Sequence, residues 1–304
     1  MDTHDPDQPP LTDLIIPFQL ESSGLRGRIV SLSSVINQIL APHGYPAVVN
    51  QLLGETVTLC ALLSSMLKYE GIFTLQTSGD GPIPMLISDM TYEGHVRGCA
   101  SFHEDRLQAL TAEISSSPGG LSGASLSSWL GKGYIAFTVD QGQHAERYQG
   151  IVELQGQSLV SCVQHYFTQS EQIGSGIVLA VGQGQDGIWY AQGIMLQQMP
   201  EDRNKNHLSH TEEDDWRRAM MLLQTCTESE LLDPSLSPYD VLHRLFHEEG
   251  VRVYTPMPIT KGCRCNRAKV EGILAMMSED DKQEMRVNGE IRMTCEFCNQ
   301  DFVF

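Results

Sequence analysis

The sequence predicts an α+β protein in three parts: a mixed α/β body, a helical linker and a small cysteine-bearing C-terminal domain with a helix and a β-hairpin. Strand-like and helix-like segments first mix irregularly up to about Pro200. A polar stretch, residues 201–215, then precedes two helix-like segments. Two cysteine pairs follow in a segment too short for a core of its own. The expected boundaries are 1–200, 201–258 and 259–304.

Within the body, each expected element has a local signal. GRIVSLS, residues 27–33, predicts a first strand, and Pro46 opens a long apolar segment that we expect to be helical as far as Gly71. FTLQTSGDGPIPMLISD has two apolar runs around Gly-Asp-Gly, which indicates a β-hairpin. GKGYIAFTVD and YQGIVELQG predict strands, SLVSCVQHYFTQS a helix, and GIVLAVGQGQDGIWYAQGIMLQQ a pair of strands.

The linker shows two helix signals. Ser209 and Glu212 form a capping-box pattern before apolar residues at helical spacing, namely Trp216, Ala219, Met220 and Leu223. Asp233-Pro234 ends this helix, and Ser237-Pro238 starts another that Gly250 stops. The second helix carries Val241, Leu242, Leu245 and Phe246 on one face. From the residues alone, this region is a pair of solvated helices packed on the body.

Composition excludes several classes of protein. The formal net charge of -18 and the isoelectric point near 4.8 argue against a nucleic-acid surface, which needs clustered Lys and Arg. The N-terminal MDTHDPDQPP lacks the basic and apolar regions of a signal peptide. No apolar run approaches the roughly 20 residues of a membrane span. We therefore expect a cytoplasmic protein with no membrane or nucleic-acid partner, whose thiols stay reduced.

The cysteine pairs carry the strongest chemical signal. Cys263 and Cys265 form C-x-C, and Cys295 and Cys298 form C-x-x-C. Four thiolates at such spacings suit tetrahedral Zn²⁺, so we expect one zinc ion per chain. Val270, Ile273, Leu274 and Met277 predict a helix between the pairs, and Asn288-Gly289 predicts a turn. A bound metal would supply most of the stability of this tail. A purely structural zinc site fits the same spacing.

A thioredoxin-like redox site fits less well, since its C-x-x-C sits at a helix N-terminus and here the pair lies between strand-like pieces with Glu296 inside it. The other four cysteines stand alone, and we expect them to take no part in the centre: Cys60, Cys99, Cys162 and Cys226. Cys60 and Cys162 lie in apolar helical stretches and are interpreted as buried thiols.

Motifs of nucleotide-dependent enzymes and hydrolases are missing. Gly182, Gly184 and Gly187 match G-x-G-x-x-G, but a strand follows rather than a helix, so a hairpin turn is the better interpretation. The sequence has no P-loop, no H-E-x-x-H and no G-x-S-x-G. We therefore expect neither ATP binding nor catalysis.

CRCNRAKV together with CEFCNQDFVF resembles the C-terminal zinc centre of the thirty-three-kilodalton heat-shock family, the redox-regulated holdase chaperones of bacteria. The resemblance extends over nearly the whole chain. The blocks that carry it are GRIVSL, LLGE, LKYEGIFTLQTSGDGPI, HVRG, LGKGYIAFTVD, YQGIVELQG, YFTQSEQI, GIMLQ and HRLFHEEGVRV.

The resemblance implies a redox switch. In the reduced state the thiolates hold zinc, and a metastable linker covers client-binding surface. Hypochlorous acid, or peroxide combined with unfolding stress, converts the cysteine pairs to disulfides, zinc is lost, and the tail and linker unfold. The protein then forms a dimer and holds unfolding client proteins without ATP. The linker residues exposed by this change would be Trp216, Met220, Leu242 and Phe246.

Four cysteines allow three disulfide connectivities. Local geometry favours Cys263–Cys265 and Cys295–Cys298, and the tight C-x-C ring predicts that the Cys295–Cys298 bond forms first, as the resemblance also implies. Two other functions stay open: a thiol-disulfide oxidoreductase, and an adaptor whose zinc never leaves.

Overall fold

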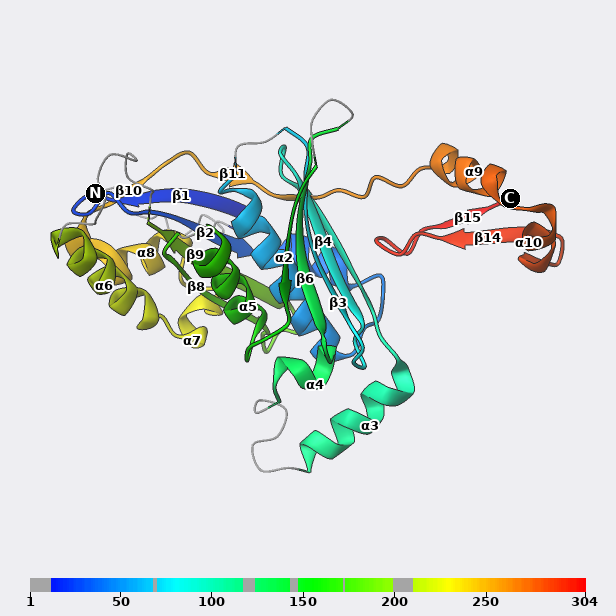
Figure 1. Ribbon diagram of the computed structural model, residues 1–304, viewed down its shortest axis with the longest axis horizontal. Coiled ribbons are helices and arrows are strands. Elements are labelled where there is room, and N and C mark those ends of the chain that lie inside the picture. The colour runs from blue at the N-terminus through cyan, green and yellow to red at the C-terminus, as the bar shows by residue number, and fades with distance from the viewer. Residues whose placement is uncertain (1–11, 68–69, 117–123, 143–146, 172, 199–209) are drawn as a thin grey trace.

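The computed structural model describes residues 12–67, 70–116, 124–142, 147–171, 173–198 and 210–304. Two six-stranded sheets enclose the long helix α2 (Ala47–Ser64). Helices of the linker cover the outer face of the first sheet, and the C-terminal segment lies beside the outer face of the second (Figure 1). The predicted α+β class is confirmed.

Sheet 1 has the strand order β10-β1-β2-β9-β8, with β11 also paired to β1. Its strands are β1 (Leu14–Leu20), β2 (Arg26–Leu32), β8 (Ser175–Gln183), β9 (Trp189–Gln197), β10 (Val251–Val253) and β11 (Met257–Pro258). The predicted first strand is β2. The predicted hairpin turn joins β8 to β9, where the Gly184 N–H donates to the Ile188 carbonyl at 2.8 Å.

Sheet 2 has the order β12-β5-β4-β3-β6-β7. Its strands are β3 (Ile72–Gly79), β4 (Met85–Thr91), β5 (His95–Ser101), β6 (Gly133–Asp140), β7 (Tyr148–Glu153) and β12 (Thr260–Lys261). The hairpin expected around Gly-Asp-Gly is confirmed, since β3 and β4 pair antiparallel up to Ser78 and Met85. β12 joins this sheet parallel to β5 just before the first cysteine pair.

Helix α2 ends at Ser64, so the expected helix to Gly71 was too long. The Ser64 and Ser65 hydroxyls donate to the carbonyls of Ala61 and Leu62, and these short-range bonds favour a turn over another helical turn. By length and composition α2 could span a membrane, with a mean hydropathy of 1.4, but 72% of it is buried in the core.

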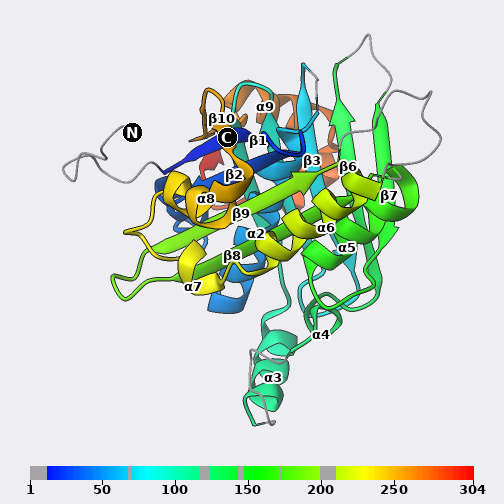
Figure 2. The same cartoon turned by 90° about the vertical axis from the view of Figure 1, so that its left-hand side faces the viewer.

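The described part of the body also contains smaller helices. They are α1 (Ser34–Leu40), α3 (Glu104–Ser115), α4 (Leu126–Leu130) and α5 (Leu159–Tyr166), which continues as a π-helical turn, η2 (Phe167–Glu171). Helix α3 projects away from both sheets and buries only Leu107 among its residues (Figures 1 and 2).

The linker forms α6 (His210–Gln224), α7 (Glu228–Leu231), α8 (Pro238–Phe246) and a 3-10 turn, η3 (His247–Glu249). Figure 2 shows these helices in front of sheet 1. Phe246 stacks on Phe18 of β1 with ring centroids 6.0 Å apart, inside a second apolar core. Ser237 and Asp240 form a capping box at the start of α8. The capping box expected at Ser209 lies outside the described residues.

The C-terminal segment has α9 (Arg267–Met276), α10 (Glu279–Glu284) and a three-stranded sheet of β13 (Arg286–Val287), β14 (Glu290–Thr294) and β15 (Asp301–Val303). The predicted turn at Asn288-Gly289 is present, with both residues at positive φ. Only Leu274, Ile291 and Phe302 of these elements are buried hydrophobic residues. So small a core contributes little stability by itself.

Candidate metal centre

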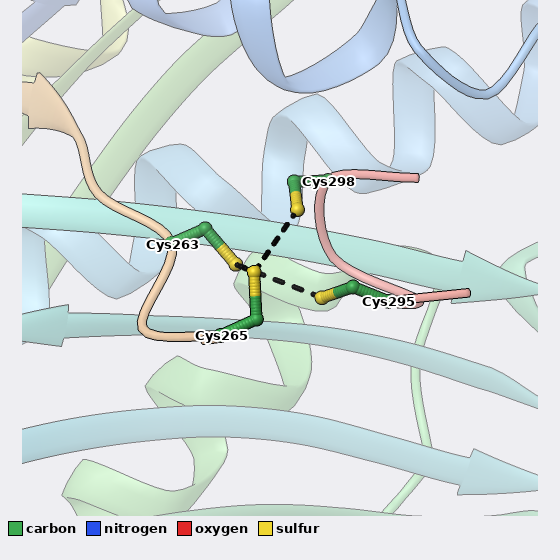
Figure 3. Close-up of side chains that lie close together, drawn as sticks. All are labelled: Cys263, Cys265, Cys295 and Cys298. Atoms are coloured by element: carbon green, nitrogen blue, oxygen red, sulfur yellow. Dashed lines mark hydrogen bonds between the residues drawn. The ribbon is translucent and has the colours of Figure 1, made fainter. Parts of the chain in front are cut away.

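The four thiols of the C-terminal segment converge on one point, as Figure 3 shows. All four sulfur atoms lie within 4.8 Å of one another. The Cys263 sulfur is 3.3 Å from that of Cys265 and 3.7 Å from that of Cys295, and Cys265 is 3.4 Å from Cys298. Each cysteine is half-buried. Two cysteine pairs that are distant in the sequence thus share one site.

Two short turns position the thiols. Cys263 and Cys265 follow β12 and precede α9, whose first turn is capped by the Asn266 side chain accepting from the Lys269 N–H at 2.9 Å. Cys295 and Cys298 belong to a turn between β14 and β15. There the Asn299 N–H donates to the Cys295 carbonyl at 2.8 Å, and Asn299 has a φ of 57°, which a residue with a short polar side chain tolerates.

Burial and mutual hydrogen bonds shift the pKa values of these thiols. Burial acts to raise the pKa of Cys263, but hydrogen bonds from the Cys265 backbone N–H and the neighbouring thiols outweigh it and lower that pKa to about 7. Burial raises the pKa of Cys265 and of Cys298. The centre therefore favours a thiolate at Cys263 first, and a divalent cation would favour all four. Four converging sulfurs suit a tetrahedral ion, so the centre could hold one metal.

Both turns also contact the body. Arg264, inside C-x-C, places its Nη2 2.7 Å from Asp89 Oδ1 on β4. Phe297, inside C-x-x-C, has its ring 3.7 Å from the guanidinium carbon of Arg97 on β5. Arg97 Nε in turn donates to both oxygens of Asp89, at 3.1 and 2.9 Å. Asp89 is buried, so an ion pair with two arginines and an aromatic ring joins the cysteine turns to sheet 2.

Polar contacts to the loop after α1 add to this attachment. The Asn299 side chain donates to the Pro42 carbonyl at 2.7 Å, and His43 Nε2 lies 3.4 Å from the Phe297 carbonyl oxygen. Lys261 Nζ donates to the Gln38 carbonyl at 2.9 Å. None of these contacts was foreseen from the sequence. The only available signal was that Arg264 and Phe297 occupy the intervening positions of the cysteine pairs.

The other four cysteines lie elsewhere. Cys60 on α2 and Cys162 on α5 are fully buried, as the sequence predicted, Cys99 on β5 is buried and Cys226 is half-buried. Burial raises the pKa of Cys60 and of Cys99 to about 12, and it also raises those of Cys162 and Cys226. In the described part of the chain, the four C-terminal cysteines are the thiols that meet in one cluster.

The linker residues singled out by the sequence differ in burial. Leu242 and Phe246 are fully buried on α8. Trp216 and Met220 are half-buried on α6, where they pack over Gly174 and Gly176 next to β8. All four face sheet 1 or its margin. The sequence therefore identified apolar linker residues that pack on the body, and their role in client binding stays a prediction.

The fold and the thiol cluster define an α+β protein whose C-terminal segment carries a potential metal centre. A family model described as Hsp33 protein matches residues 13–304. The chain belongs to the Hsp33 family of chaperones.

Relatives and a solved structure agree with this assignment. A 33 kDa chaperonin of Caulobacter vibrioides is 36% identical over 299 residues, covering 97% of this chain and 95% of the relative. One of Pseudomonas fluorescens is 35% identical over 297 residues, covering 97% and 91%. The crystal structure of the Thermotoga maritima 33 kDa chaperonin shares the fold, with a TM-score of 0.79 at 24% identity and coverage of 96% and 94%.

Proposed function

We propose that this protein is a redox-regulated holdase chaperone that prevents aggregation of unfolding proteins without ATP. The observation that carries the proposal is the convergence of four thiols in a segment that has almost no apolar core and is attached to the body through its cysteine turns. Such a segment depends on the state of its thiols. The proposed parts are a body to residue 200, a linker to 258 and a switch domain from 259, in a cytoplasmic protein.

In the reduced state, Cys263, Cys265, Cys295 and Cys298 would hold one zinc ion as thiolates. Zinc in such sites contributes folding free energy, on the order of 10 kcal/mol or more. The chain's own residues contribute the rest: the two turns that aim the sulfurs inward, and the contacts of Arg264 and Phe297 with the body. In this state the segment stays folded and the linker stays packed on sheet 1.

Oxidation changes the charge of the site. Forming a disulfide removes two electrons and two negative charges from a pair of thiolates, and neutral disulfide sulfurs are poor metal ligands. The C-terminal segment then keeps only its small core, so it unfolds, and Arg264 and Phe297 lose their fixed positions against Asp89 and Arg97. We propose that the linker follows, because short helices owe their stability to tertiary packing.

Release of the linker would expose a large apolar surface. The face of sheet 1 under the linker carries buried residues of β1, β2 and β9, among them Ile16, Phe18, Ile29 and Ile194. Exposed apolar area of this kind binds other exposed apolar surfaces. We propose that it binds unfolding client proteins and lets the oxidised protein form a dimer. Neither ATP nor nucleic acid is part of this mechanism, and no catalytic turnover is proposed.

The pairing of the cysteines is a testable part of the proposal. Sulfur distances alone do not decide it, since Cys265 is as close to Cys298 as to Cys263. However, one residue separates Cys263 from Cys265 and two separate Cys295 from Cys298, so these two pairs close the shortest loops. We expect the disulfides Cys263–Cys265 and Cys295–Cys298. The Cys295–Cys298 bond should form first, because the C-x-C ring of the other bond is strained. Peptide mass mapping that finds mainly Cys265–Cys298 would contradict this.

The function itself is tested by aggregation of a heat-unfolding client. Light scattering should be suppressed by oxidised protein and not by reduced protein at equal concentration. A variant with Cys295→Ser and Cys298→Ser lacks two ligands of the centre, so it should not hold zinc and, unlike the parent, its suppression should not depend on the redox state. Suppression that is equal in both redox states would favour the zinc-stabilised adaptor. Catalytic turnover of a dithiol substrate without suppression of aggregation would favour the oxidoreductase.

A further inference from the structure

A cavity opens beside the thiol centre, between the C-terminal segment and sheet 2. Two of the four thiols, Cys265 and Cys295, lie in its wall. Three cationic side chains also line it: Arg97 from β5, Arg264 from the first cysteine turn and Lys269 from α9. The remaining wall is mostly apolar and consists of Val270, Ile273, Met293, Thr294 and Phe302. The cavity therefore connects solvent to sulfur along a cationic and apolar path.

The wall of this cavity is positively charged, whereas the molecule as a whole is negatively charged. The chain has a formal net charge of -18, yet none of the residues that line this cavity is a carboxylate. Asp89 contacts Arg97 and Arg264 and offsets one of the three positive charges. Arg264 Nη1 is buried and, among the described residues, has no hydrogen-bond partner. Lys269 Nζ donates to the Arg264 carbonyl. This hydrogen bond fixes the ammonium group at the cavity wall but does not neutralise its charge.

We propose that this cavity is the entrance through which small anionic disulfides with an apolar body reach Cys265 and Cys295. The inference rests on the proposed function, because it concerns the oxidation of the same centre. A protein this acidic repels anions, and a divalent ion held by four thiolates leaves a net charge of about -2 at the centre. The two positive charges not offset by Asp89 cancel that repulsion locally. A cleft lined with one sign of charge raises the encounter rate of the opposite sign.

The chemistry is a thiol-disulfide exchange. The thiolate of Cys265 or Cys295 attacks one sulfur of the small disulfide, whose S–S bond breaks. One half leaves as a thiolate, and the other half remains in a mixed disulfide with the cysteine. A neighbouring cysteine thiolate then attacks the cysteine sulfur of this mixed disulfide and releases the second half as a thiolate. Two cysteine thiolates are oxidised to one protein disulfide, and one small disulfide is reduced to two thiolates.

The test compares two aromatic disulfides, the dianionic dithiobis(nitrobenzoate) and the neutral dithiodipyridine, on full-length reduced protein. The variant is Lys269→Gln, which removes one cation that does not contact Asp89. At low salt the rate with the dianion should fall several-fold, by about 3 to 10, while the rate with the neutral disulfide stays the same. High salt should remove the difference. Lys282→Gln on α10, outside the cavity, is the matched control and should leave both rates unchanged.

The readout is the absorbance of the released thiolate, with mass mapping of the first mixed disulfide to Cys265 or Cys295. It needs no client, so it can fail while the holdase function holds, and the reverse is also true. Lys269→Arg keeps the charge and should restore the rate with the dianion. Equal changes with both disulfides would show a structural effect of the lysine and would overturn the proposal. An unchanged rate with the dianion would also overturn it, as would first attack at a cysteine outside the C-terminal segment.

Discussion

Glu55 is a carboxyl group on the core helix α2. Burial raises its pKa to about 7, a hydrogen bond with Gln51 partly opposes this shift, and the charge of Glu228 at the start of α7 adds to it. Because the pKa in the folded protein exceeds the ordinary value of 4.5, the folded state holds the proton more tightly than the unfolded state. The free energy of unfolding therefore falls as the pH rises from about 4.5 through 7.

Glu55→Gln should remove this pH dependence. At pH 8 the variant should be more stable than the parent, by on the order of 2 to 3 kcal/mol, and at pH 4.5 the two should be nearly equal. Urea unfolding of the reduced protein at both pH values measures the difference. Glu104→Gln on the exposed start of α3 is the control. A gain of equal size at both pH values would contradict the argument.

Three cysteines of the body and one of the linker are expected to take no part in the redox response: Cys60, Cys99, Cys162 and Cys226. Their raised pKa values leave little thiolate at neutral pH, and thiolate is the reactive form. A variant with all four replaced by alanine should bind one zinc ion and still gain holdase activity on oxidation. Loss of activation with zinc binding and circular dichroism intact would show that these thiols matter.

At the level of residues, the sequence identified the thiol cluster because metal ligands must occur in a limited set of spacings. The sequence did not indicate Asp89 and Arg97, although these residues contact the cysteine turns through Arg264 and Phe297. Their role depends on which face of β4 and β5 points away from α2. That in turn depends on strand register, and β5 itself was not predicted. Contacts between distant segments are decided by tertiary packing, which local patterns do not encode.

Among the elements, the linker helices are anchored unequally. Helix α8 buries four large apolar side chains, namely Val241, Leu242, Leu245 and Phe246, whereas α6 buries Ala219 and Leu223 and adds half-buried residues such as Trp216 and Met220. An ion pair joins α6 to η3, the turn that follows α8, since Arg218 Nε donates to the buried Glu249 at 2.6 Å. We infer that α8 contributes most of the apolar stabilisation of the linker.

Phe246→Ala should therefore loosen the linker in reduced protein. Removing a buried phenylalanine from a core costs about 3 to 5 kcal/mol, which is large for so short a region. We expect faster amide exchange across residues 210–250 and partial holdase activity without oxidation. Met221→Ala is the matched control, since Met221 lies on α6 with 60% of its surface exposed. Equal behaviour of the two variants would contradict the assignment to α8.

The sequence predicted long elements better than short ones. β2, β8, β9, the β3–β4 hairpin, α5 and α8 carry clear periodicity or caps. β1 was missed, and Pro17 within it weakens the strand signal. β10, β11 and β12 have two or three residues each and are strands only because β1 and β5 offer them partners. Such short segments have no pattern of their own to detect.

On the scale of the whole molecule, metal removal should distinguish the regions whose folding depends on the thiol centre from those whose folding does not. Chelation of zinc together with oxidation should raise amide exchange sharply in the C-terminal segment and across residues 210–250. Strands β3 to β7 and α2 should stay protected, because apart from Ile259 and Met257 their core consists of body residues. Hydrogen exchange with mass spectrometry measures this directly. Unchanged amide exchange across the linker in oxidised, zinc-free protein would contradict the proposed coupling between the thiol centre and the linker, and would favour the adaptor function.

Sheet 1 holds the chain on both sides of the linker helices, through β9 before them and β10 after them. A released linker is therefore a closed loop rather than a free tail, as long as β10 stays paired. The released residues gain conformational entropy, and closing them into a loop offsets this gain by a cost that grows only with the logarithm of the loop length. Its helices also remain at high effective concentration near the face they left. A client bound there would compete continuously with this loop, so reduction of the thiols could drive client release without a nucleotide.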